Sequence, residues 1–119
     1  MVSADPPPAP GGPAPSFQER FAALSRDWRA QLPARLDTLQ SLLQACRQAP
    51  HDDPGLQELY RQAHMLAGSA GTFGLHALGE QARALDLELQ HVMAKHSRQA
   101  SDFDDAGRLL QALLAAPRE

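Results

Sequence analysis

The residues with the clearest chemical potential lie in the stretch that begins at His64. The sequence there reads His-Met-Leu-Ala-Gly-Ser-Ala-Gly-Thr-Phe-Gly and ends at Gly74. Histidine is nucleophilic near neutral pH, because its unperturbed pKa is about 6.5. Glycine inside a helix costs roughly 1 kcal/mol relative to alanine, so Gly68 and Gly71 require a reason. Without side chains at these positions, a partner surface could approach the imidazole closely.

Other patterns in the chain give weaker evidence for a functional site. The three glycines of this stretch are followed by no lysine and preceded by no strand pattern, which argues against a P-loop or a dinucleotide fingerprint. His91 and His96 are five residues apart, whereas two metal ligands on one helical face are four apart. Asp86 and Glu88 are two apart, so they are expected on different faces. No metal site is predicted.

The composition bounds the class of protein. The chain has 119 residues, the length of one small domain, and it contains no isoleucine and only one tyrosine and one tryptophan, which favours helices over strands. A net charge of −3 without a basic stripe does not indicate nucleic-acid binding. The single Cys46 fits a reducing compartment. Because the chain has neither a membrane-spanning apolar run nor a secretory signal, we expect a cytoplasmic protein without membrane contact.

The elements before His64 can be placed from capping and breaker residues. Residues 1–15 are rich in proline and glycine, which predicts a disordered tail. Ser16 and Glu19 have the spacing of a capping box and predict a first helix. Pro33 is expected to start a second helix, which ends near residue 49, because proline suits a first helical turn.

The remaining helices follow from apolar periodicity. Asp53 is the expected N-cap of the third helix, Pro54 its first residue and Gly74 its left-handed C-cap. A nearly strict heptad seam predicts a fourth helix, and Ser101 or Asp102 caps the last. The apolar stripe of the third helix comprises Leu56, Leu59, Ala63, Leu66, Ala70 and Phe73, and that of the fourth Leu75, Leu78, Ala82, Leu85, Leu89 and Val92. We therefore predict an all-α fold over residues 16–116, an antiparallel four-helix bundle with an additional N-terminal helix.

Helical geometry gives the direction of His64. At about 100° per residue, His64 lies about 140° from the centre of the apolar stripe of its helix, and Gly68 about 180°. The imidazole is therefore expected in solvent, on a face shared with Tyr60, Arg61 and Gly71.

The motif from His64 to Gly74, followed by Leu78, Ala82 and Leu85 at helical intervals, resembles the histidine-containing phosphotransfer (HPt) domains of multistep phosphorelays. The resemblance extends over residues 16–116. It implies that His64 accepts a phosphoryl group from an aspartate of one receiver domain and passes it to another. The implied partners are receiver domains of response regulators and of a hybrid sensor histidine kinase, and the chain would act as a monomeric carrier rather than as an enzyme. It would need no cofactor of its own, because Mg²⁺ is expected in the receiver's pocket.

One position departs from the family pattern. The family usually has lysine three residues after the histidine, and this chain has Ala67 there. Arg61, three residues before His64, could supply the missing charge to the phosphoryl group; the alternative is that Arg61 is simply solvated. The residues expected to dock the partner are Tyr60, Met65, Ala67, Gly68, Gly71 and Leu75.

Two other functions remain open from the sequence. Ala67 leaves room for a degenerate HPt-like module that binds receivers or a kinase without carrying phosphate. A purely structural helical bundle with an incidental histidine would leave Gly68 and Gly71 unexplained.

Overall fold

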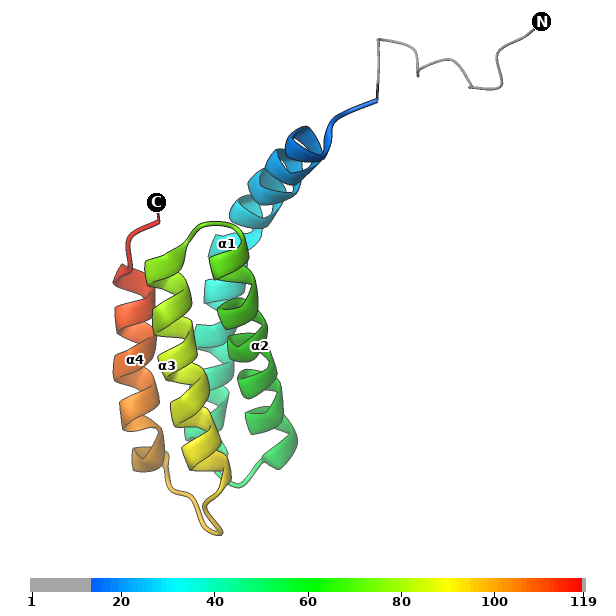
Figure 1. Cartoon of the computed structure of the whole chain (residues 1–119). Coiled ribbons are helices and arrows are strands. Elements are labelled where there is room, and N and C mark those ends of the chain that lie inside the picture. The colour runs from blue at the N-terminus through cyan, green and yellow to red at the C-terminus, as the bar shows by residue number, and fades with distance from the viewer. Residues whose placement is uncertain (1–13, 119) are drawn as a thin grey trace, which may run out of the picture. The chain divides into compact units, whose positions relative to one another are not determined.

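The structure, a computed structural model, describes residues 14–118, and these contain helices and no strand (Figure 1). The elements in chain order are α1 (Phe17–Gln48), α2 (Asp53–Thr72), α3 (His76–Met93), the short 3-10 helix η1 (Ala100–Phe103) and α4 (Asp104–Ala115). The prediction of an all-helical fold is confirmed. The expected tail lies almost entirely outside the described residues.

The helix break expected at Pro33 is wrong, because α1 continues through this residue. Proline removes one helical hydrogen bond and clashes with the preceding turn, at a cost of about 3 kcal/mol. The leucines that flank it, Leu32 and Leu36, are 2% and 3% exposed, and their burial offsets this cost. The first half of α1 is therefore not a separate helix. Its predicted capping box is present, since the Glu19 amide donates to Ser16 Oγ at 3.1 Å.

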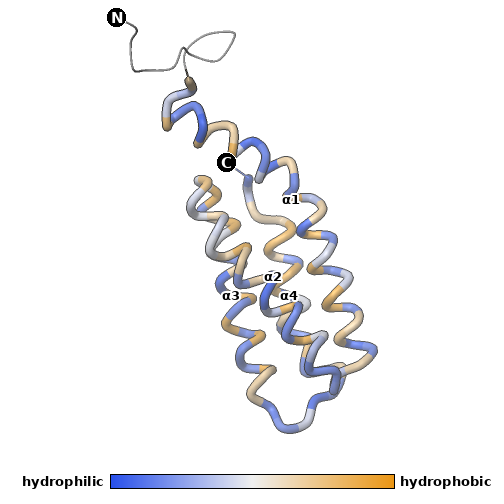
Figure 2. The backbone as a smooth tube through the Cα atoms, turned by 90° about the vertical axis from the view of Figure 1, so that its right-hand side faces the viewer, coloured by the Kyte–Doolittle hydropathy of each residue, from blue (hydrophilic) through white to orange (hydrophobic). Residues whose placement is uncertain are grey.

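The described residues divide into two units, one ending at Ala30 and the other beginning at Gln31. In the second unit, α2 packs against α3 and α3 against α4, the remainder of α1 runs alongside α4, where Arg47 pairs with Asp104, and each helix is antiparallel to the one before it (Figure 1). Figure 2 shows apolar and polar residues alternating along every helix, as amphipathic helices require. The buried apolar residues include Leu39, Leu43, Leu59, Leu66, Leu78, Leu85, Leu89, Phe103, Leu110 and Leu113.

Both ends of α2 are capped. The N-cap is Asp52 rather than the expected Asp53, and its Oδ1 accepts from the Gly55 amide at 3.2 Å. Gly74 has a φ of 83° and ends the helix in the left-handed conformation, as predicted. The Leu75 amide donates to the Ala70 carbonyl at 2.8 Å and thereby closes the turn into α3.

The segment before α4 also differs from expectation. Asp102 does not cap α4 directly; its carboxylate accepts from the Gln99 amide at 2.7 Å and starts η1, and α4 begins at Asp104. The buried Arg98 donates to the Pro50 carbonyl at 2.8 Å and pairs with Asp53. This arginine ties the α1–α2 loop to the loop between α3 and η1.

Candidate functional site

His64 lies in the middle of α2, and its side chain is 63% exposed, as its helical position predicts. Its Nδ1 lies 2.8 Å from Oδ2 of Asp86 on α3, and the Asp86 side chain is only 7% exposed. The other carboxylate oxygen of Asp86 accepts from Gln90 Nε2 at 3.0 Å. Because a carboxylate can only accept, the neutral imidazole carries its proton on Nδ1. Nε2 is then left with the lone pair of a nucleophile.

The role of Asp86 was missed from the sequence, where only its spacing from Glu88 was considered. Asp86 directly follows Leu85, on the apolar seam of α3, and it is 5% exposed. A carboxylate at a core position must find a hydrogen-bond partner, because its desolvation is otherwise too costly. A carboxylate beside the apolar seam of α3 was therefore a signal in the sequence, but the sequence alone does not identify His64 as its partner.

Two neighbours on α2 shape the surroundings of the imidazole. The half-buried Tyr60 stacks on His64 with ring centroids 5.6 Å apart and an angle of 26° between the planes. One turn of helix separates them, so the phenol ring limits the rotation of the imidazole. Met65 is 43% exposed and adds an apolar contact surface beside the histidine.

The geometry gives no support to the predicted role of Arg61. Its Nε and Nη2 donate to the carboxylate of Glu58 at 2.9 and 2.6 Å, and its Nη1 lies 3.3 Å from the Met65 sulfur. Hydrogen bonds, first from Arg61 and then from Gln62, lower the pKa of Glu58 to about 2. The arginine charge is thus already paired with a carboxylate on its own helix.

The glycines beside His64 border open space. A Cβ atom built on Gly68 or on Gly71 would meet nothing within 4 Å, so packing inside the protein does not require glycine there. The structure gives no support to the expectation that Leu75 docks a partner, because this side chain is fully buried. Ala67 is 7% exposed and contributes only the floor of a shallow hollow.

That hollow lies between α2 and α3 and has a volume of about 180 Å³. It is lined by Ala67, Gly71, His76, Gly79, Glu80 and Arg83. The helices approach closely at one edge of it, since a Cβ atom on Gly79 would lie 3.4 Å from the Gly71 backbone nitrogen.

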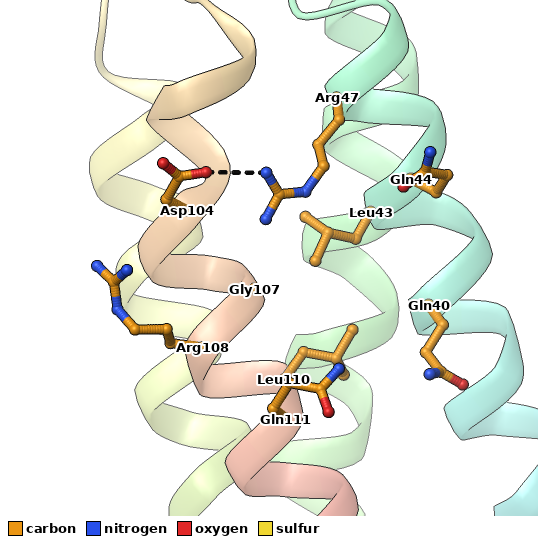
Figure 3. Close-up of a pocket in the computed structure, with 9 residues that line it drawn as sticks. All are labelled: Gln40, Leu43, Gln44, Arg47, Asp104, Gly107, Arg108, Leu110 and Gln111. Carbon is orange, nitrogen blue, oxygen red and sulfur yellow. Dashed lines mark hydrogen bonds and ion pairs between the residues drawn. The ribbon is translucent and has the colours of Figure 1, made fainter.

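A larger groove of about 540 Å³ separates α1 from α4 (Figure 3). Figure 3 shows Arg47 reaching across it to Asp104, with 2.9 Å between Nη1 and Oδ1. The residues that line it include no histidine, cysteine or serine, so it presents no nucleophile. Within residues 14–118, no group of three metal-ligating side chains converges, and no helix has the length and apolarity to cross a membrane.

The imidazole of His64 is exposed to solvent, its Nδ1 faces a buried carboxylate, and the glycines beside it border open space, so its Nε2 is chemically accessible from outside the protein. Comparison with known families agrees: the profile of the Hpt domain matches residues 23–118. The chain belongs to the Hpt domain family, whose members act in histidine phosphotransfer within phosphorelays. No curated protein and no solved structure matches the chain significantly.

Proposed function

We propose that this protein relays a phosphoryl group between aspartates of receiver domains through His64. The observation that carries the proposal is the 2.8 Å contact between Nδ1 of this exposed imidazole and the buried Asp86 carboxylate. It orients the ring and leaves Nε2 available for attack. In the fold we propose, residues 31–116 form the antiparallel four-helix bundle that holds α2 and α3 in this register.

In the proposed transfer step, His64 does not need to release a proton. Nε2 attacks the phosphorus of an aspartyl phosphate on the receiver, an N–P bond forms, and the P–O bond to the receiver's carboxylate breaks. That carboxylate leaves with the electron pair. The imidazole, which keeps its proton on Nδ1, becomes positively charged, and the Asp86 carboxylate beside it stabilises this charge. Reversal of the step on a second receiver passes the group on.

We propose that the receivers supply the rest of the chemistry. Phosphoryl transfer needs Mg²⁺ to balance the charge on the moving group, and the ion would come with the receiver. The protein would then act as a monomeric carrier between a hybrid sensor kinase and a response regulator. Its docking face would comprise Tyr60, Met65, Gly68 and Gly71, which surround His64 on one side of α2.

The test is label transfer from a receiver domain phosphorylated with radioactive acetyl phosphate. We expect acid-labile, base-stable label on the wild type and none on His64→Gln. His91→Gln is the matched control, because His91 is also exposed near the end of a helix but has no carboxylate partner among the described residues. Label that persists on His64→Gln would place the phosphoryl group elsewhere.

Ala67 favours a second candidate, a module that binds receivers without carrying phosphate. In that case the wild type would bind the receiver, as measured by calorimetry, and no label would appear on any variant.

A further inference from the structure

The phosphoryl group on His64 needs a positive charge that α2 does not provide. Ala67 has no charge, and Arg61 is paired with Glu58 through two hydrogen bonds. A transferring phosphoryl group carries negative charge on its oxygens, and arginine binds such oxygens with its planar, permanently charged guanidinium. The cation must therefore come from another helix or from the partner.

Arg83 on α3 is placed to be that cation. His64 and Asp86 face each other across α2 and α3, which are antiparallel. Ala67 lies three residues after His64, and Arg83 lies three residues before Asp86. Because the two helices are antiparallel, both residues are displaced by about 4.5 Å in the same direction along the helix axes. Their shared position in the hollow agrees with this register, because both line it.

The surroundings of Arg83 leave its guanidinium available. The residue is exposed, and it forms no hydrogen bond or ion pair with any residue in 14–118. Glu80 and His76 also line the hollow, but neither is paired with Arg83. The lack of side chains at Gly71 and Gly79 keeps the hollow open. Its volume of about 180 Å³ exceeds the roughly 10–15 Å³ that one water molecule requires.

We propose that Arg83 binds the phosphoryl oxygens on His64 and so replaces the lysine that the family carries at position 67. This inference rests on the proposed function. Ala67 belongs to the same arrangement, since a lysine there would fill the hollow and place a like charge beside Arg83. The cation has thus moved from α2 to the facing turn of α3.

The first experiment measures the initial rate of label transfer from a phosphorylated receiver. We expect Arg83→Ala to lower the rate about tenfold, since a partly solvated charge contact is worth about one factor of ten, and Arg61→Ala to stay within twofold of wild type. Ala67→Lys should restore most of the rate in the Arg83→Ala background but add little to wild type. Rescue of this kind would not follow from a merely structural role.

If receivers fail to label the wild type, that result refutes the proposed function but does not test Arg83. A second experiment therefore tests Arg83 without a receiver. Phosphoramidate, a small phosphoryl donor, is used to phosphorylate His64, and the second pKa of the phosphoryl group is followed by phosphorus NMR. We expect a lower pKa in the wild type than in Arg83→Ala, because the guanidinium stabilises the dianion. Equal pKa values and equal transfer rates in the two proteins would overturn the role of Arg83, as would resistance of the wild-type histidine to phosphoramidate.

Discussion

At the scale of single residues, Asp86 is a carboxylate held at a core position by two hydrogen bonds, from His64 and from Gln90. A buried charge is costly to keep, and its replacement by a neutral group of similar shape is often harmless to stability. Under the proposed function, its presence is explained by the positive charge that it would stabilise on the imidazole.

We therefore predict that Asp86→Asn slows phosphorylation of His64 about tenfold without lowering the free energy of unfolding. The amide oxygen can still accept from Nδ1, so the ring stays oriented, but the negative charge is lost. Initial rates of label transfer and urea titrations measure the two effects. Glu88→Gln serves as the control on the same helix, and an Asp86→Asn protein as fast as wild type would contradict the electrostatic role.

A second prediction uses variants of Gly68 to distinguish an effect on receiver binding from an effect on stability. A Cβ atom at this position meets nothing within 4 Å, so Gly68→Ala should stabilise α2 by up to about 1 kcal/mol. If a receiver approaches closely there, the same variant binds it more weakly, and Gly68→Gln more weakly still. Urea unfolding measures the stability of each variant, and calorimetry measures its affinity for the receiver. Thr38→Ala is the control, because it raises helix propensity on α1. Unchanged receiver affinity in Gly68→Gln would count against close approach.

At the scale of elements, the start of α2 depends on a cap that two residues share. Asp52 accepts from the Gly55 amide, and a Cβ atom on Gly55 would lie only 2.7 Å from Asp52 Oδ2. The absence of a side chain at Gly55 is therefore what lets the carboxylate sit over the end of the helix.

We predict that Asp52→Ala and Gly55→Ala each lower the free energy of unfolding by about 1 kcal/mol, the usual value of an N-cap. The double variant should lose less than the sum, because both changes remove the same interaction. Urea titrations of the four proteins form the cycle. If the two losses of unfolding free energy were additive, Gly55 would affect stability by a mechanism other than the N-cap.

At the scale of the whole molecule, contacts between loops at one end hold the helices in register. Arg98 joins the α1–α2 loop through the Pro50 carbonyl and Asp53, and Lys95 pairs with Asp102 at 3.0 Å. The Gln99 amide, and then Lys95, lower the pKa of Asp102 below its ordinary value.

This shift gives a pH dependence with a definite sign. A carboxyl whose pKa is lower in the folded state adds stability above its unfolded pKa of about 3.9, and this stability is lost as the pH falls through the folded pKa. Glu58, with a folded pKa of about 2, acts in the same direction. We expect Asp102→Asn to reduce the stability at pH 7 and to flatten its decline between pH 5 and 2, as measured by urea unfolding at several pH values. A decline as steep as that of wild type would exclude Asp102 as a contributor.

Much of this protein follows from local sequence. Apolar residues spaced by three and four predict α2 and α3, and Gly74 predicts the left-handed end of α2. The exposure of His64 could also be predicted, because the direction of a side chain on a helix depends only on its offset from the apolar stripe.

Tertiary structure decided the rest. Burial of the leucines around Pro33 kept α1 continuous where local preference predicted a break. Asp53 pairs with Arg98, and the N-cap of α2 is Asp52, one residue earlier. The pairing of Asp86 with His64 joins residues 22 positions apart, and so depends on the register of two packed helices. Local patterns determine which way a helix faces; only packing determines what each face meets.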